Sequence, residues 1–272
     1  MTMAGEAVQV GELAVRASGV GKTFASKSGD VVALAEVELT VAAGGFVSLI
    51  GPSGCGKSTL LRLIADLDDA SSGELEIFGK PARQARIDQD YGIAFQQAGL
   101  LPWRTVASNI GLPLELHRMP RAEREARVAE LAALVGLSDF VERYPDQLSG
   151  GMQQRVAIAR ALAEQPRLLL MDEPFGALDE MTREYLQGEL ARIAAETGAA
   201  VVFVTHSIPE AVFLSDRVVV MSPRPGRITD ILPMDLGDRR DEVLRESPAY
   251  FERVTAVREA LHGAPVERAN ER

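Results

Sequence analysis

Hydrophobic residues recur along this chain with two different spacings, and each spacing predicts a different kind of secondary-structure element. Near the N-terminus apolar residues stand at every second position, as in Val37, Leu39 and Val41, which predicts a half-exposed strand. The region 13–41 as a whole predicts short strands, with Phe24 in a loop-like stretch and a turn at 28–30. Residues 1–11 are small and polar and are expected to be loosely ordered.

Continuous apolar runs recur further along the chain and predict strands that are buried on both faces. Strands are predicted at 46–50, 91–95, 168–171, 199–205 and 218–221. A further strand at 74–78 alternates apolar and polar residues, and an edge strand is predicted at 228–232. Apolar residues three and four positions apart predict helices at 121–135, 139–144, 151–164, 182–196 and 209–214. A last helix is expected to start at Ser247-Pro248, to pack through Phe251, Val254, Val257 and Leu261, and to end at Gly263.

Strands that alternate with helices predict an α/β fold with a largely parallel sheet and helices on both faces. The alternation is interrupted at about 99–165, where the pattern predicts a helical insertion between two strands of the sheet. The length of 272 residues suits one large domain with appendages.

Charge and cysteine content narrow the class of protein. The net charge is −10, so a partner with a phosphate backbone is disfavoured and no nucleic acid is expected to bind. Cys55 is the single cysteine, which rules out an intrachain disulfide and fits a reducing compartment. Neither a signal peptide nor an apolar run of about 18 residues is recognisable. We therefore expect a cytoplasmic protein that, if it works at a membrane, depends on another chain for the membrane spans.

The stretch after the 46–50 strand predicts a phosphate-binding loop, which we call the phosphate loop: Gly51, Pro52, Ser53, Gly54, Cys55, Gly56, Lys57, Ser58 and Thr59. Its glycines allow successive N–H groups to point at an anion, and the helix that follows adds the positive end of its dipole. Lys57 can reach the β- and γ-phosphates, and the Ser58 hydroxyl can ligate Mg²⁺. This pattern predicts a nucleoside triphosphate site.

Two further stretches fit such a site. Asp172 and Glu173 follow the buried 168–171 strand, so their carboxylates are expected beside the phosphate loop. Asp172 is placed to hold Mg²⁺, and Glu173 could accept a proton from an attacking water. Ser149 is a natural N-cap, and the N–H groups of Gly150 and Gly151 form a second anion site at that helix end.

With these features in this order, residues 12–232 resemble the ATP-binding subunit of an ABC transporter, and Leu148-Ser149-Gly150-Gly151 matches the family's signature motif. The resemblance implies a phosphate-loop NTPase core of the RecA-like type, an antiparallel β subdomain near the N-terminus and an inserted α-helical subdomain at about 99–165. Residues 233–272 would form a short C-terminal helical extension. The cofactors implied are ATP and Mg²⁺.

The resemblance also implies roles for single residues. Gln96 matches the glutamine that touches Mg²⁺ and the attacking water, although Gln97 is an equal candidate from chemistry alone. Asp179 belongs to a loop that crosses the dimer interface, His206 matches the switch histidine on the γ-phosphate, and Phe24 takes the place of the aromatic on adenine. Two departures from the usual pattern are Phe24, where tyrosine is commoner, and Met152, where glutamine is commoner.

Such subunits pair head to tail, with each ATP between the phosphate loop of one subunit and the Ser149 helix of the other. The implied partners are a second copy, transmembrane permease subunits and, indirectly, a periplasmic or extracellular substrate-binding protein. The implied location is peripheral, on the cytoplasmic face of the cell membrane. Phosphate-loop kinases and GTPases lack the Leu-Ser-Gly-Gly motif.

Three stretches, at 100–106, 174–179 and 222–228, are similar to the nitrate/sulfonate/taurine importer group. A lipid- or lipoprotein-handling ABC ATPase, or an importer of pyrimidine or riboflavin-type precursors, remains an alternative. Trp103 is either an anchor for the membrane partner or a core residue. Alkylation of Cys55 is expected to block ATP binding.

Overall fold

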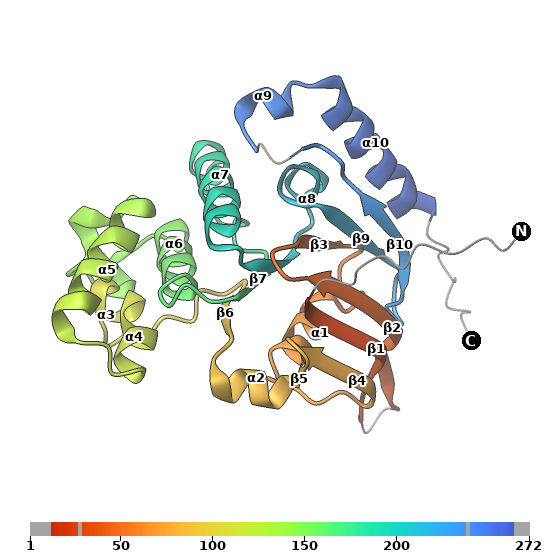
Figure 1. Cartoon of the computed structure of the whole chain (residues 1–272), viewed down its shortest axis with the longest axis horizontal. Coiled ribbons are helices and arrows are strands. Elements are labelled where there is room, and N and C mark those ends of the chain that lie inside the picture. Colours follow the sequence, from red (N-terminus) through yellow and green to blue (C-terminus); the bar gives the residue numbers. More distant parts are fainter. Residues whose placement is uncertain (1–11, 27–28, 238–239, 264–272) are drawn as a thin grey trace, which may run out of the picture.

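The molecule is built on a six-stranded sheet in the order β10-β9-β3-β8-β7-β6 (Figure 1). This computed structural model describes residues 12–26, 29–237 and 240–263, so residues 1–11 and position 28 of the expected turn lie outside the described part. The strands of this sheet are β3 (Phe46–Ile50), β6 (Tyr91–Ala94), β7 (Leu168–Asp172), β8 (Ala200–Val204), β9 (Arg217–Met221) and β10 (Ile228–Pro233). All neighbours are parallel except β10, which is antiparallel to β9. Strand β10 lies at one edge of the sheet, as predicted.

Burial of the central strands explains their apolar runs. Every residue of β3, β7 and β8 is buried, because helices or strands cover both faces of the sheet. On one face α1 (Lys57–Ile64) and the N-terminal strands form one hydrophobic cluster with the sheet. On the other face α7 (Glu180–Thr197) and α8 (Ile208–Leu214) belong to a separate hydrophobic cluster.

A second, antiparallel sheet in the order β2-β1-β4-β5 packs over α1. Its strands are β1 (Leu13–Phe24), β2 (Val31–Ala42), β4 (Ser72–Ile77) and β5 (Lys80–Pro81), with α2 (Ala82–Asp88) after them. The alternation of Val37, Leu39 and Val41 with exposed positions is confirmed. The expectation of several short strands over 13–41 is wrong, because pairing with β2 extends β1 through Phe24, which ends a strand and does not lie in a loop.

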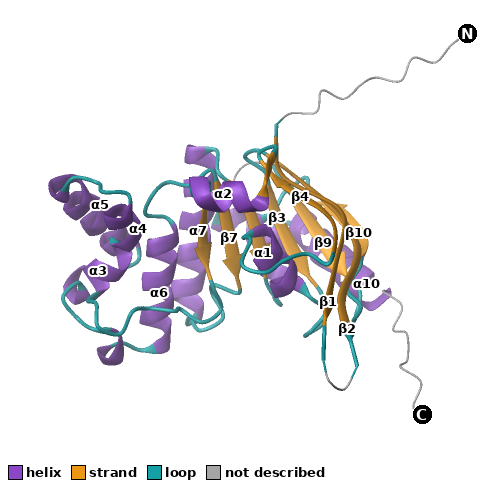
Figure 2. Ribbon diagram, turned by 90° about the horizontal axis from the view of Figure 1, so that it is seen from below, coloured by secondary structure: helices purple, strands orange, loops and turns teal. Residues whose placement is uncertain are grey.

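A group of helices lies at the opposite end of the molecule from the antiparallel sheet (Figure 1 and Figure 2). It contains α3 (Val106–Ile110), α4 (Leu112–Leu116), α5 (Arg121–Leu134), the 3-10 turns η1 (Ser138–Phe140) and η2 (Pro145–Gln147), and α6 (Gly150–Ala161). The predicted helix at 139–144 is wrong. Tyr144 is extended, as a residue before proline prefers, and Pro145 opens η2. Helices α3 and α4, five residues each, are too short to show a period in the sequence.

The C-terminal region forms α9 (Glu242–Arg245) and α10 (Pro248–Gly263), which pack beside α8. Helix α10 buries Val254 and Val257 as predicted, and Leu261 packs partly buried against the core, but the prediction for Phe251 is wrong: it is 57% exposed, and Tyr250 is buried in its place. Tyr250 holds this place because its hydroxyl also donates to the Pro209 carbonyl at 3.0 Å. Among the described residues no helix is both long and apolar enough to cross a bilayer.

Candidate functional site

The phosphate loop connects β3 to α1 and is held in an open curl by backbone conformation. Gly54 and Gly56 have φ of 75° and 107°, the left-handed region in which side chains are strained. A Cβ on Gly56 would also lie 2.6 Å from Leu34 Cδ2. The Lys57 ammonium donates to the carbonyl oxygens of Gly51 at 2.8 Å and Pro52 at 3.1 Å, so it spans the mouth of the loop.

Ser58 and Asp172 form an oxygen pair at the end of β7. The Ser58 hydroxyl donates to Asp172 Oδ1 at 2.9 Å, and burial raises the pKa of the Asp172 carboxyl while this hydrogen bond and Lys57 oppose the rise. No group of three or more His, Cys, Asp or Glu side chains that could hold a metal occurs in the described ranges. The Ser58 hydroxyl and the Asp172 carboxylate are a pair of hard oxygen donors, and such a pair suits Mg²⁺, which keeps water and phosphate oxygens as its other ligands.

Glu173 lies directly beyond β7 in a strained backbone conformation, with φ of 49°. Its amide donates to the Val204 carbonyl at 2.9 Å, which ties it to the neighbouring strand β8. One carboxylate oxygen lies 2.5 Å from His206 Nε2, and the other accepts from Gln96 Nε2 at 3.0 Å. The ends of β6, β7 and β8 thus bring three side chains together, and Gln96 is the glutamine that reaches the carboxylate.

A cavity of about 570 Å³, which we call the nucleotide cavity, joins the loop to these three side chains. Of the residues predicted for the site, it is lined by Phe24, Ser53, Gly54, Gly56, Lys57, Ser58, Thr59, Gln96, Glu173 and His206. Phe24 lies at the end of β1 and is 41% exposed, with Lys22 Nζ 4.9 Å from the ring centroid. Gly51, Pro52, Cys55 and Asp172 support the loop and its edge without lining the cavity.

Sequence reasoning missed three residues that line the same cavity: Val31, Ala33 and Arg224. Arg224 Nη2 donates to the Gly54 carbonyl at 3.2 Å. Gly226 places this segment by donating to the Ala33 carbonyl at 2.9 Å. In the sequence, the 222–228 stretch is notable only for its similarity to the nitrate/sulfonate/taurine importer group. Its contact with the phosphate loop joins residues far apart in the sequence, so the local pattern does not indicate it.

Replacing Gly226 by Ala is expected to lower the affinity for ATP about tenfold or more. A Cβ at this position would lie 1.9 Å from the Cys55 carbonyl oxygen, so the phosphate loop must shift. Equilibrium ATP binding by calorimetry measures the effect. Gly188→Ala is the control, since a Cβ on Gly188 meets nothing within 4 Å. Equal affinity in Gly226→Ala and the native chain would contradict the expectation.

Cys55 itself is 1% exposed, and its sulfur lies 3.7 Å from Lys57 Nζ. A thiol reagent can reach this sulfur only if the phosphate loop opens. The expected block of ATP binding by alkylation therefore requires a conformational change that the sequence did not indicate.

The second predicted anion-binding feature lies in a separate cavity of about 410 Å³, which we call the signature cavity. The Ser149 hydroxyl caps α6 by accepting from the Met152 amide at 3.2 Å. Asp179 caps α7 by accepting from the Thr182 amide at 3.0 Å, and backbone and side-chain hydrogen bonds with Thr182 lower the pKa of Asp179. The lining consists of Ser149, Gly150, Gly151, Met152, Arg155, Ala177, Leu178 and Asp179. No lining residue belongs to the nucleotide cavity as well.

Comparison with known proteins agrees with this geometry. The family model described as "ABC transporter" matches residues 34–176. Taurine import ATP-binding protein TauB of Rhizobium johnstonii is 46% identical over 88% of this chain and 93% of its own length. Nitrate import ATP-binding protein NrtC of Synechococcus elongatus is 47% identical over 82% of this chain and 34% of its own.

Among solved structures, the dimeric ATP-binding cassette MJ0796 in a post-hydrolysis state bound to ADP and Pi is similar, with a TM-score of 0.76 and 36% identity. The likeness covers 81% of this chain and 98% of that one. The fold class and the family predicted from the sequence are thereby confirmed. The chain belongs to the ABC transporter family, as an ATP-binding cassette with that family's ATPase fold.

Proposed function

We propose that this chain is the ATP-hydrolysing subunit of a membrane importer and that it works as a head-to-tail dimer. The observation that carries the proposal is the separation of two phosphate-binding features in one chain: Lys57 lines the nucleotide cavity, and Ser149 lines the signature cavity. Each chain then supplies one half of each of two sites. A two-fold axis brings the Ser149 helix of each copy onto the phosphate loop of the other.

The residues of the nucleotide cavity have complementary roles in this proposal. Lys57 and the loop amides hold the phosphates, Phe24 stacks on adenine, and Glu173 accepts the proton of the attacking water, which Gln96 and His206 orient. Ser58 and Asp172, with Gln96, would hold Mg²⁺, whose chemistry is to neutralise charge on the transferred phosphoryl group. Residues 12–232 act as the ATP-binding domain, with the helical insertion at about 99–165 and the extension at 233–272.

The helical insertion offers the surface for the membrane partner. Trp103 is 70% exposed and Leu116 is 67% exposed, which argues against a core role for Trp103. Asn109 is fully buried and makes its loop rigid: its amide bonds to the Leu101 amide and to carbonyl oxygens of Leu101, Arg104 and Thr105. A large apolar side chain on a preorganised loop is typical of an interface anchor.

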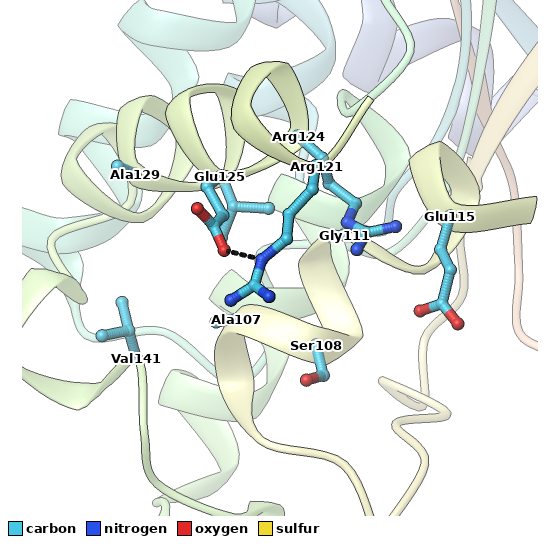
Figure 3. Close-up of a pocket in the computed structure, with 10 residues that line it drawn as sticks. Ala107, Ser108, Gly111, Glu115, Arg121, Arg124, Glu125, Ala129 and Val141 are labelled. Carbon is cyan, nitrogen blue, oxygen red and sulfur yellow. Dashed lines mark hydrogen bonds and ion pairs between the residues drawn. The ribbon is translucent and has the colours of Figure 1, made fainter. Parts of the chain in front are cut away.

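A cavity of about 400 Å³ adjoins this loop, between α3, α4 and α5 (Figure 3). Ala107, Gly111 and Ala129 leave room in it, while Arg121 and Glu125 form an ion pair at its rim. Glu115, which also lines the cavity, pairs with Arg104 at 2.7 Å and so links it to the Trp103 loop. We assign this surface to the permease, with the chain peripheral on the cytoplasmic side of the membrane.

Helix α6 connects that surface to both half-sites. Arg160, in its last turn, donates to the carbonyl oxygens of Ala98 at 2.8 Å and Gly99 at 3.0 Å, just after Gln96. Gln154 donates to the Phe95 carbonyl at 3.0 Å, just before Gln96. The same helix begins at the Ser149 cap. Displacement of the Trp103 loop by a permease would therefore reach Gln96 and the signature cavity together.

Trp103→Ala is expected to abolish co-purification with a multi-span permease while the isolated chain keeps its native ATPase rate. The ATPase rate should stay unchanged because Trp103 lines neither the nucleotide nor the signature cavity. Ile87→Ala, which removes a 57% exposed side chain from α2, is the matched control. Normal permease recovery with Trp103→Ala would refute the docking assignment.

The solute is tested in the assembled transporter with its substrate-binding protein in membranes. We expect ATP hydrolysis to rise when that protein is loaded with a small anion, with taurine, an alkanesulfonate and nitrate as the probes. Stimulation by a lipoprotein in place of these anions would favour a lipid-handling system. Stimulation by a pyrimidine or riboflavin precursor would replace the anion assignment.

A further inference from the structure

The C-terminal helices α9 and α10 contact the element that follows the switch histidine. Helix α8 starts two residues after His206. Tyr250 of α10 donates to the Pro209 carbonyl in the first turn of α8, and Arg245, the last residue of α9, lies 3.7 Å over the ring of Phe213. The extension thus packs on the helix whose N-terminus leads out of the nucleotide cavity.

Arg245 makes a second contact that leads inward. Its Nη2 donates to Gln187 Oε1 at 2.5 Å, and Gln187, on α7, is 1% exposed. The other end of this amide donates to Glu210 Oε1 at 3.2 Å. Because an amide has its acceptor and its donors on opposite sides, the bond from Arg245 fixes which face of Gln187 meets Glu210.

Glu210 is 9% exposed and bonds directly to the histidine segment. Its Oε2 accepts from Thr205 Oγ1 at 2.5 Å, and Thr205 Oγ1 in turn accepts from the Ser207 amide at 3.0 Å. Thr205 and Ser207 flank His206, so the bonds set the path of the backbone on both sides of the imidazole. Burial raises the pKa of the Glu210 carboxyl, opposed by its bonds to Thr205 and Gln187 and by Arg183.

A branch of the same network reaches the loop that contains Asp179. Arg183 Nε lies 3.8 Å from Glu210 Oε1, and Arg183 Nη2 donates to the Leu178 carbonyl at 2.8 Å. Leu178 lines the signature cavity. The buried carboxylate of Glu210 is therefore shared by the histidine segment, the Asp179 loop and the C-terminal extension.

We propose that Arg245 is a positioning residue for ATP hydrolysis, acting through Gln187, Glu210 and Thr205 on His206. The proposal rests on the role of His206 in the proposed function. His206 Nε2 lies 2.5 Å from the Glu173 carboxylate, so a change in the histidine segment displaces the group that orients the attacking water. The phosphate loop lies on β3 and α1, outside this network, so affinity for ATP is left intact.

The test compares Arg245→Met, which keeps an unbranched side chain but loses the guanidinium that donates to Gln187 and lies over Phe213, with Arg245→Lys, which restores a cationic donor. We measure kcat and KM for ATP and thermal unfolding on the full chain. We expect kcat to fall about tenfold in Arg245→Met with KM and unfolding temperature unchanged, because small displacements of an orienting group act on turnover. Arg245→Lys should recover most of kcat. Arg253→Met, in an exposed pair with Asp235, is the control and should match the native chain.

A second measurement places the effect in the network. Thr205→Val removes, at constant size, the hydroxyl that ends the series of hydrogen bonds from Arg245 to the histidine segment. Arg245→Met should therefore cause no further loss of kcat in that background. Native kcat in Arg245→Met, an equal loss in Arg253→Met, or full additivity with Thr205→Val would overturn the proposal. Absence of ATP hydrolysis in the native chain would instead refute the proposed function.

Discussion

Replacing Glu173 by Gln is expected to lower ATP turnover by a factor of about 10²–10⁴ and to leave ATP binding near its native level. The amide cannot accept a proton from water, yet it keeps the shape that lies between His206 and Gln96. The residues that we propose to hold the phosphates, Lys57 above all, are unchanged. Phosphate release in the steady state and equilibrium binding of ATP measure the two effects separately.

Glu189→Gln is the control for this substitution, because Glu189 is a carboxylate on α7 whose partner is Arg192 and which lies outside the nucleotide cavity. Its turnover should equal that of the native chain. Turnover of Glu173→Gln within a few-fold of native would exclude Glu173 as the base, and His206 would then be the next candidate to replace.

The second large effect concerns assembly. In the Glu173→Gln background ATP is not consumed, and we expect the chain to form a stable dimer with ATP and Mg²⁺. Adding Ser149→Arg should abolish this dimer, because a bulky cation then occupies the capped end of α6. ATP should still bind to the monomer, since the nucleotide cavity shares no lining residue with the signature cavity. Light scattering and equilibrium binding on the same samples separate the two results.

Ser138→Arg, an exposed position in η1, is the control and should dimerise normally. Loss of ATP binding in the monomeric Ser149 variant would mean that the nucleotide site is complete within one chain. A native chain whose hydrolysis per subunit stays constant on dilution to monomer would lead to the same conclusion.

Most of the nucleotide site could be predicted because each part is local in sequence. The phosphate loop and His206 follow strands, the Asp172-Glu173 pair stands at the end of β7, and parallel strands bring their carboxyl ends to one edge of a sheet. Gln96 follows β6 in the same way, which is why it meets Glu173 although 77 positions separate them.

Contacts outside this rule could not be predicted. Arg224 and Gly226 reach the phosphate loop from a connection between β9 and β10, and nothing in their own spacing indicates a phosphate. Arg245 bonds to a glutamine 58 positions away. Helix α3 is built around Asn109, whose four bonds are made to a loop and not to a periodic apolar face. Such polar contacts leave no repeat in the sequence.

The separation of the nucleotide and signature cavities has a genetic consequence. A subunit that carries Lys57→Ala together with Ser149→Arg keeps the Trp103 surface, so it would still enter transporters through the permease and damage both ATP sites there, one through its own loop and the other through its helix. If native and doubly altered subunits are incorporated equally, about a quarter of the transporters keep both sites whole. The double variant should therefore be dominant in a cell that also makes the native chain.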